Sequence, residues 1–386
     1  MASLRQIVGQ GRKRIGFLIG AGVPAGLLAA NGKDPLIPVA AGLTDLVLTA
    51  LAPVYGETLQ AIKKELKNPN IENILSRVRS LAGVIGTTPV HKLDGKGYET
   101  LGKAICEEIG KIVNQTLPSG STTYSNLVNW ISGTDREHPI EIFTTNYDLL
   151  FEQALERAKV SYFDGFTGGN APFFDPSSVA SNDLPPRWVR LWKLHGSVCW
   201  DSNDRGEIVR IPGSKSTHLV FPEHLKYDQT QKAPYSALFD RLRSFLMTQD
   251  TLLIASGFSF ADAHVSARID ECLTANPSAS VFAFQFRALA GEPFACDIAR
   301  RRPNVSVYAP DKALINGVEA PWVPGDPPTR DWGPIRAGYW GIEPGIVDAH
   351  FLLGNSAQLA TFLASSRSEQ TFTILSPTTS GGGAPA

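Results

Sequence analysis

The chain has 386 residues, 43% of them hydrophobic, and its 36 basic and 37 acidic side chains give a net charge of −1. This length exceeds the roughly 250–300 residues at which one hydrophobic core stops growing, so more than one domain is expected. The balanced charge predicts no direct nucleic-acid binding, and the apolar runs are far shorter than the roughly 18 residues of a membrane span. We expect a cytoplasmic protein that does not bind membranes.

The chain begins with a basic segment and the short apolar run Ile15–Ile19, which predicts a buried strand rather than a signal peptide. A glycine turn follows at Gly20-Ala21-Gly22. Residues 43–131 then lack strand patterns and predict an inserted helical module, in which Asn70 or Asn73 caps a helix. Its expected helices, punctuated by Pro53, Pro69 and Pro89, are Leu46–Tyr55, Leu59–Leu66, Ile71–Val84, Tyr98–Val113 and Tyr124–Ile131.

Strand-like runs return after residue 131 and alternate with helical segments such as Leu149–Lys159 and Ser236–Met247. This alternation predicts an α/β fold with a Rossmann-like, doubly wound and mostly parallel sheet. Residues 165–186 and 201–217 are expected to be long loops. The expected strands are Ile140–Thr145, Val160–Phe163, Val189–Leu194, His218–Phe221, Thr251–Ala255, Ser280–Phe286 and Val305–Tyr308.

The C-terminal part carries a hairpin signal at Asn316-Gly317, an irregular segment at 323–346 and a last helix at Phe351–Leu363. The tail after Ser365 is expected to be disordered. These patterns divide the chain into a catalytic domain at 1–42 and 132–310, the helical module at 43–131, a C-terminal part at 311–365 and the tail at 366–386.

The four cysteines stand at positions 106, 199, 272 and 296, and none forms a CxxC pair. This spacing argues against both a zinc ribbon and a disulfide scaffold, so we expect buried thiols and no metal site.

Four polar or glycine-rich segments follow or close apolar runs, at 20–22, 144–148, 193–197 and 257–262. Ligands of open α/β sheets bind at the carboxyl ends of strands, so these segments predict one nucleotide site. Gly20, Ala21 and Gly22 permit close approach of a diphosphate to the backbone, although a purely structural turn explains them as well.

The second segment offers an amide and a carboxylate. Asn146 could hydrogen-bond a ribose hydroxyl or position a water, or could simply occupy a turn. Asp148 could bind a carboxamide nitrogen, or could cap the helix that follows.

The third segment offers His195, an imidazole suited to general-base catalysis, followed by Gly196, which allows close approach. Lys193 could be solvated or touch phosphate. In the fourth segment Gly257 and Ser259 could form a second phosphate or ribose turn. Asp262 could bind a ribose hydroxyl, but Ser259 and Asp262 together also fit a helix N-terminus.

The four segments, in this order, resemble those of the sirtuin superfamily, and particularly its bacterial NAD-hydrolysing branch from anti-phage defence systems. The residues Asn-Ile-Glu-Asn-Ile-Leu at 70–75 and the last helix also look like that branch. The resemblance implies that Gly20, Ala21 and Gly22 bind the NAD diphosphate, that Asn146 and Asp148 lie by the nicotinamide ribose and carboxamide, and that His195 is the base. Gly257 and Ser259 would contact the adenosine half, and NAD is the substrate.

The chain departs from deacylating sirtuins, which carry a Gly-Ile-Pro-Asp-Phe-Arg-like stretch and paired CxxC motifs that this sequence lacks. Water is therefore the expected acceptor, and ADP-ribose and nicotinamide are the expected products. The alternatives are a protein deacylase or ADP-ribosyltransferase, and a scaffold that binds NAD or ADP-ribose without chemistry. The resemblance also suggests a homo-oligomer, with a HerA-type DNA-translocating ATPase or an Argonaute-like protein as a possible partner.

Overall fold

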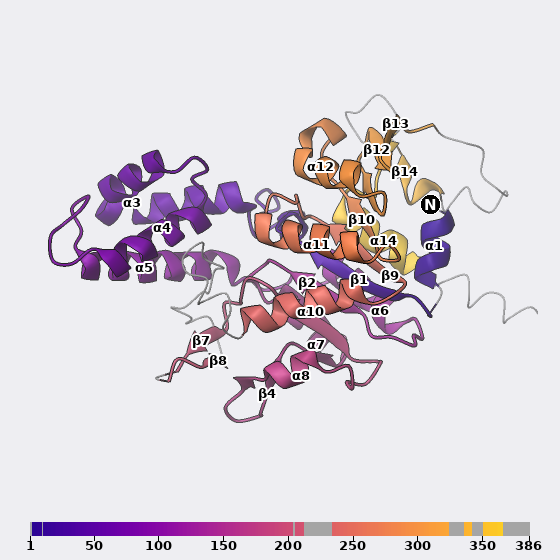
Figure 1. Cartoon of the computed structure of the whole chain (residues 1–386), viewed down its shortest axis with the longest axis horizontal. Helices are drawn as coiled ribbons and strands as arrows, with labels where there is room; N and C mark the ends of the chain where they lie inside the picture. Colours follow the sequence, from indigo (N-terminus) through magenta and orange to yellow (C-terminus); the bar gives the residue numbers. More distant parts are fainter. Residues whose placement is uncertain are drawn as a thin grey trace, which may run out of the picture.

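The computed structural model describes residues 2–9, 11–203, 205–211, 234–323, 336–341 and 350–365. A nine-stranded sheet forms the centre of this described structure, in the order β13-β12-β11-β10-β9-β1-β2-β6-β3 (Figure 1). The bounds of these strands are β1 Arg14–Ile19, β2 Glu141–Thr144, β3 Tyr162–Phe163, β6 Val189–Lys193, β9 Thr251–Ser256, β10 Ser280–Phe284, β11 Val305–Tyr308, β12 Lys312–Ile315 and β13 Val318–Pro321.

Every pairing from β11 across to β3 is parallel, and β12 and β13 add an antiparallel edge. The predicted doubly wound, mostly parallel sheet is therefore confirmed. Strand β1 lies between β2 and β9, so the chain winds outward from β1 in one direction and from β9 in the other. This arrangement makes the carboxyl ends of β1 and β9 the topological switch point, where such sheets bind ligands.

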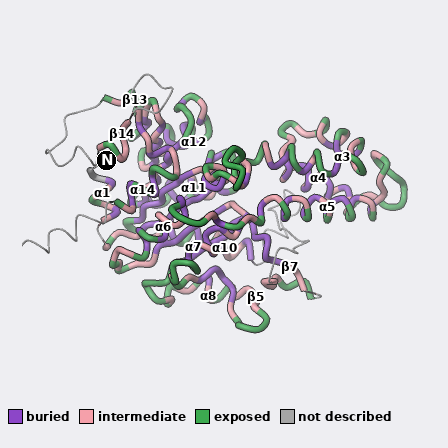
Figure 2. Tube along the Cα trace, turned by 180° about the vertical axis from the view of Figure 1, so that it is seen from behind, coloured by how far each residue is buried: buried purple, intermediate pink, exposed green. Residues whose placement is uncertain are grey.

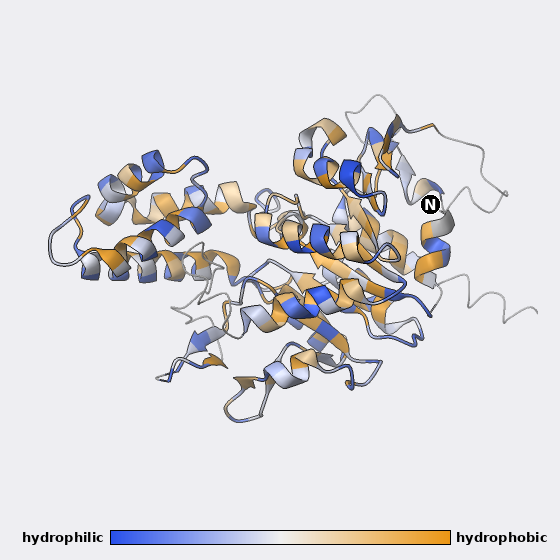
Figure 3. Ribbon diagram, viewed as in Figure 1, coloured by the Kyte–Doolittle hydropathy of each residue, from blue (hydrophilic) through white to orange (hydrophobic). Residues whose placement is uncertain are grey.

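The sheet is buried on both faces because its strands alternate their apolar side chains between two cores. In β1, Ile15, Phe17 and Ile19 face one core, whereas Leu18 faces the other. Figure 3 shows apolar residues concentrated in these central strands, and Figure 2 shows the corresponding residues as buried. A two-sided core of this kind is typical of parallel sheets.

Helices cover each face. The first core is completed by α1 (Ala2–Gly9), α6 (Thr123–Ser132), α7 (Leu150–Arg157) and α14 (Ser356–Ser365). The second is completed by α10 (Tyr235–Met247), α11 (Ala263–Ala275) and α12 (Pro293–Arg301). Helix α6 falls inside the predicted module at 43–131, yet it packs on the sheet, with the rings of Trp130 and Phe17 5.7 Å apart.

The rest of the predicted module forms three helices that project from the sheet (Figure 1). They are α3 (Ala40–Glu65), α4 (Ile71–Val84) and α5 (Gly95–Val113). The predicted cap at Asn70 is confirmed, because its Oδ1 accepts a 2.8 Å hydrogen bond from the Asn73 N–H. The predicted break at Pro53 is wrong: α3 continues through it. Pro53 and Thr49 are both exposed, so water can hydrate the carbonyl group that the proline leaves unpaired.

Two other expectations are corrected. The last helix begins at Ser356 rather than Phe351, because His350–Phe351 is strand β15, paired with β14 (Trp340–Gly341), and Asn355 accepts from the Ala357 N–H. The expected loops at 165–186 and 201–217 contain α8 (Pro176–Ala180) and a small sheet. Its strands are β4 Phe166–Thr167, β5 Phe173–Phe174, β7 Trp200–Ser202 and β8 Ile208–Arg210.

The hairpin prediction is confirmed: Asn316 and Gly317 both have positive φ between β12 and β13. The predicted strand His218–Phe221, most of the irregular segment 323–346 and the tail at 366–386 lie outside the described residues.

All four cysteines are buried, as expected, and they form no disulfide with one another. Within the described ranges, no group of three His, Cys, Asp or Glu side chains could hold a metal ion. A search of the same residues finds no helix that is long and apolar enough to cross a bilayer.

Candidate active site at the strand ends

The two glycine turns meet at the switch point. The Gly20 N–H donates to the Ser256 carbonyl at 3.1 Å, and the Gly22 N–H donates to the Gly257 carbonyl at 2.9 Å. A Cβ atom on Gly20 would lie 2.3 Å from the Gly257 oxygen, and Gly257 itself has a φ of +64°. This contact explains Gly20, Gly22 and Gly257 structurally. Their predicted role toward a diphosphate, and that of Ala21 between them, remains a prediction.

Asn146 lies beside the first turn. Its Nδ2 donates to the Gly20 carbonyl at 3.1 Å, and its backbone N–H donates to Thr144 Oγ1 at 3.0 Å. Thr144 Oγ1 in turn donates to the Ile19 carbonyl at 3.0 Å. The end of β2 is therefore tied to the end of β1, and a half-buried amide is held at the switch point.

Asp148 lies in a different environment. It is buried, and its Oδ1 accepts a 3.0 Å hydrogen bond from the Leu150 N–H at the start of α7, although the N-cap residue of this helix is Leu149, which makes no side-chain cap. Burial raises the pKa of Asp148, against the opposing charge of Lys193. Lys193 is neither solvated nor placed to meet a phosphate: its Nζ is buried, donates to the Asp148 carbonyl, and lies 3.0 Å from Glu152 Oε1.

His195 follows β6 and is 3% exposed. Its Nε2 lies 2.9 Å from Asp262 Oδ2, and its Nδ1 lies 3.9 Å from Glu72 Oε1. Neither nitrogen makes a well-aligned hydrogen bond within the described structure, so both contacts are mainly electrostatic. Tyr147 completes the group by donating its hydroxyl to Glu72 Oε1 at 2.8 Å.

The two carboxylates come from separate elements. Asp262 is the N-cap of α11, where Oδ1 accepts from the backbone N–H groups of His264 at 2.9 Å and Val265 at 3.0 Å. Asp262, rather than Ser259, thus caps this helix. Glu72 lies in the first turn of α4, so the projecting helices contribute directly to the site. Sequence reasoning missed Glu72 as a site residue, and its only signal was the resemblance of residues 70–75.

The charges of His195, Asp262 and Glu72 stabilise one another. Burial alone would lower the pKa of His195, but the carboxylates of Asp262 and Glu72 outweigh it and raise this pKa to about 9. Burial opposes ionisation of Asp262, yet the imidazole and the backbone N–H of Val265 hold its pKa at about 2. Burial likewise opposes ionisation of Glu72, and contacts with His195 and Tyr147 lower its pKa. At neutral pH the group is an imidazolium between two carboxylates.

We expect Asp262→Asn to lower the pKa of His195 from about 9, because a neutral amide removes the nearest negative charge while preserving the helix cap. An NMR titration of the imidazole measures this shift. Because the folded-state pKa of His195 is raised, its ionisation stabilises the fold below pH ~6.5, and this contribution is lost as pH rises through about 9. The variant should lose part of that pH dependence.

The resonances of His91, whose Nε2 lies 2.9 Å from Glu65 in the projecting helices, give the control in the same spectrum. They should not change. An unaltered His195 titration in Asp262→Asn would contradict the assignment of the ion pair.

Ser259 is exposed between two buried phenylalanines, Phe258 and Phe260, whose rings pack at 5.0 Å. Phe260 has a φ of +59°, an uncommon conformation for a bulky residue, which its buried ring and the following cap accommodate. The hydroxyl of Ser259 is therefore accessible, and its predicted contact with the adenosine half of NAD remains a prediction.

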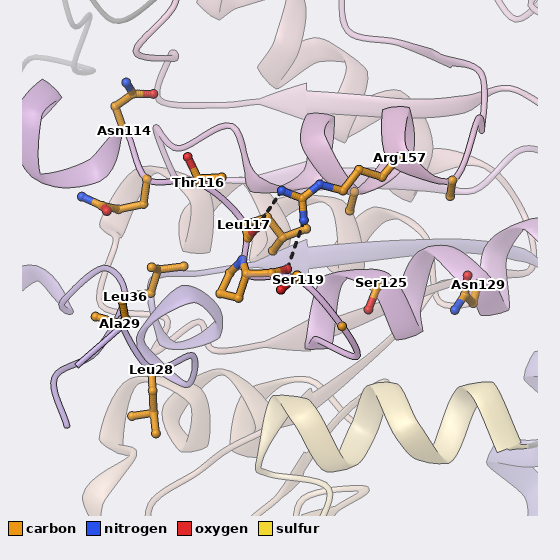
Figure 4. Close-up of a pocket in the computed structure, with 16 residues that line it drawn as sticks. Leu28, Ala29, Leu36, Asn114, Thr116, Leu117, Ser119, Ser125, Asn129 and Arg157 are labelled. Carbon is orange, nitrogen blue, oxygen red and sulfur yellow. Dashed lines mark hydrogen bonds between the residues drawn. The ribbon is translucent and has the colours of Figure 1, made fainter. Parts of the chain in front are cut away.

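A hollow of about 1130 Å³ lies elsewhere, between the segment Leu28–Leu36, residues 114–120 and helices α6 and α7 (Figure 4). The guanidinium of Arg157 at its wall is already occupied, since it donates to the carbonyls of Leu117 at 2.7 Å and Pro118 at 3.0 Å. None of the residues predicted for the site lines this hollow. We therefore assign the candidate site by the convergence of polar groups at the strand ends rather than by volume.

Comparison with known proteins gives one family match and one similar solved structure. Residues 140–306 match the family model of the SIR2-like domain, a segment that contains Asn146, His195 and Asp262 but not Gly20 or Glu72. A solved structure titled "Structural Basis for the Mechanism and Regulation of Sir2 Enzymes" is similar at 12% identity and a TM-score of 0.35, covering 76% of this chain and 87% of that chain. No curated protein matches. The family match supports the sirtuin superfamily and an NAD-dependent activity in general.

Proposed function

We propose that the chain is an NAD hydrolase that cleaves the nicotinamide–ribosyl bond and releases ADP-ribose and nicotinamide. The observation that carries this proposal is the convergence of Asn146, His195 and the two glycine turns at the switch point of a parallel sheet. The match of residues 140–306 to the SIR2-like domain supports NAD as the ligand.

In this proposal the turns at Gly20–Gly22 and at Gly257–Ser259 bind the diphosphate and the adenosine half of NAD. Asn146 lies at the nicotinamide ribose. The carboxylates beside His195 provide the negative charge that stabilises an oxocarbenium-like transition state. Water as the acceptor is supported by the sequence after the first turn, which forms α3, α4 and α5 in place of the deacylase motifs.

The biological role that fits this activity is depletion of NAD in bacterial anti-phage defence. The proposal includes control of this activity by assembly. The chain would act as a homo-oligomer or in a complex with a HerA-type ATPase or an Argonaute-like protein. Assays therefore need the protein both alone and with candidate partners.

Nicotinamide release from NAD by the purified protein, measured by chromatography across assembly states, tests the function. We expect release without any acyl-lysine substrate. Release that requires an acyl-lysine peptide would instead support a deacylase, and transfer of ADP-ribose to protein would support a transferase. Calorimetric NAD binding without turnover in every assembly would support a sensing scaffold.

A further inference from the structure

His195 is poorly placed to act as a base in this arrangement. A neutral imidazole carries one lone pair, on Nδ1 or on Nε2. Here Nδ1 faces Glu72 Oε1 at 3.9 Å and Nε2 faces Asp262 Oδ2 at 2.9 Å. In either tautomer the unprotonated nitrogen would face a carboxylate oxygen rather than a reacting proton. The imidazole is also 3% exposed, so a water molecule would meet the carboxylates first.

The two carboxylates differ in how many of their oxygens already make contacts and in how far their side chains are exposed. Asp262 uses Oδ1 for two backbone N–H groups of α11 and Oδ2 for His195, and its side chain is 19% exposed. Glu72 uses Oε1 for both Tyr147 and His195, and its side chain is 41% exposed. Among the described residues no hydrogen bond or ion pair involves its Oε2, so this is the carboxylate oxygen of the group that we take to be available to water or substrate.

The position of Glu72 is well determined. The cap at Asn70, two residues before Glu72, starts α4, and the Tyr147 hydroxyl donates to Glu72 Oε1 at 2.8 Å. The N-terminal turn of a helix also stabilises a carboxylate in its ionised form. A fixed and half-exposed carboxylate that the neighbouring imidazolium keeps ionised at neutral pH can accept a proton from a bound water molecule.

We propose that Glu72, borne by the projecting helix α4, is the catalytic base that activates water, and that His195 is the cation that orients it. This inference rests on the proposed NAD hydrolysis. As the C1′–nitrogen bond breaks, its electron pair leaves with the ring nitrogen as neutral nicotinamide. The water oxygen forms the new bond to C1′, and Glu72 accepts the water proton and later releases it to solvent.

Glu72→Gln is the decisive variant, because the amide keeps the shape and can still accept from Tyr147 while losing the proton-accepting charge. We expect nicotinamide release to fall more than about 100-fold while NAD affinity, measured by calorimetry, stays within about threefold. Glu65→Gln is the matched control: Glu65 also pairs with a histidine, His91, at 2.9 Å in the same helical module, but away from the strand ends. It should retain full activity.

The pH profile distinguishes the two bases. The groups that face His195 are Glu72 from α4, Asp262 from the start of α11 and Tyr147 from the loop after β2. His264 acts electrostatically on Asp262, and Tyr235 acts on Tyr147. With Glu72 as the base, kcat should be level from roughly pH 5 to 8 and should fall as His195 loses its proton near pH 9. A rate that climbs with pH up to about 9 would assign the base to His195 instead.

Circular dichroism confirms that Glu72→Gln is folded, and NMR should show the pKa of its His195 lowered. A folded Glu72→Gln variant that releases nicotinamide at the wild-type rate would overturn the role of Glu72 but not the proposed hydrolase activity. The same holds if the variant loses NAD binding rather than turnover of bound NAD. A wild-type protein that binds NAD but never releases nicotinamide, in any assembly, would overturn the hydrolase proposal as well.

Discussion

Nicotinamide release is expected to fall more than about 100-fold in Asn146→Ala, with the protein still folded. The amide of Asn146 is half-buried between the ends of β1 and β2, and its Nδ2 donates to the Gly20 carbonyl at 3.1 Å. Truncation removes that hydrogen bond, at a cost of about 0.5–1.5 kcal/mol, which the fold should tolerate. It also removes the polar group that we assign to the nicotinamide ribose, so the loss should appear in kcat rather than in stability.

Asn304 supplies a matched control for this prediction. It is a half-buried amide that also ties backbone segments together, with Nδ2 donating to the carbonyls of Leu273 at 3.3 Å and Ala279 at 3.0 Å. It lies beside β11, away from the glycine turns. Asn304→Ala should lose comparable stability and keep its activity. Equal activity in the two variants would contradict the assignment of Asn146 to the active site.

Replacing Arg241 by methionine is expected to destabilise the fold by about 1.5–3 kcal/mol, because it removes charge-assisted hydrogen bonds to the buried carboxylate of Glu141 and leaves the Arg190 guanidinium, at 3.6 Å, as its remaining cation. Arg241 donates through Nε to Glu141 Oε2 at 2.8 Å and through a terminal nitrogen to Oε1 at 2.5 Å. Both side chains are buried, and the Trp192 indole N–H donates to the same Oε2 at 2.8 Å. Denaturant unfolding measures the loss as a reduced midpoint at unchanged slope.

The triple variant Glu141→Leu/Arg190→Met/Arg241→Met should recover much of this stability, since Arg190 is the second buried partner of Glu141 and apolar residues can replace a whole buried set of ion pairs. Arg243→Met, an exposed arginine on the same helix, should change stability by no more than about 0.5 kcal/mol. Glu141 begins β2, whereas Asn146 follows its end, so kcat per folded molecule should not change. If Arg241→Met were as stable as the triple variant, the predicted role of these buried ion pairs would be contradicted.

Local patterns in the sequence predicted much of the fold. Apolar runs located β1, β2, β6 and β9, and both boundaries of α4 and the end of α5 followed from spacing and from the cap at Asn70, whereas α5 begins at Gly95, three residues before the predicted start. Such features depend on neighbours within a few residues, so periodicity and capping chemistry suffice. The same reasoning failed at Pro53, where the exposure of one face of α3 decides whether a proline is tolerated.

The sequence by itself determined which residues stand at the strand ends, because each segment directly follows its own apolar run. Only the tertiary structure decided which of their side chains meet. Glu72, His195 and Asp262 are far apart along the chain, and their contacts depend on how α4 returns to the sheet and on where Asp262 caps α11. Burial, and with it the charge of each group, is likewise set by that packing: Lys193 lies against Glu152, and His195, predicted as the base, lies buried between two carboxylates that raise its pKa.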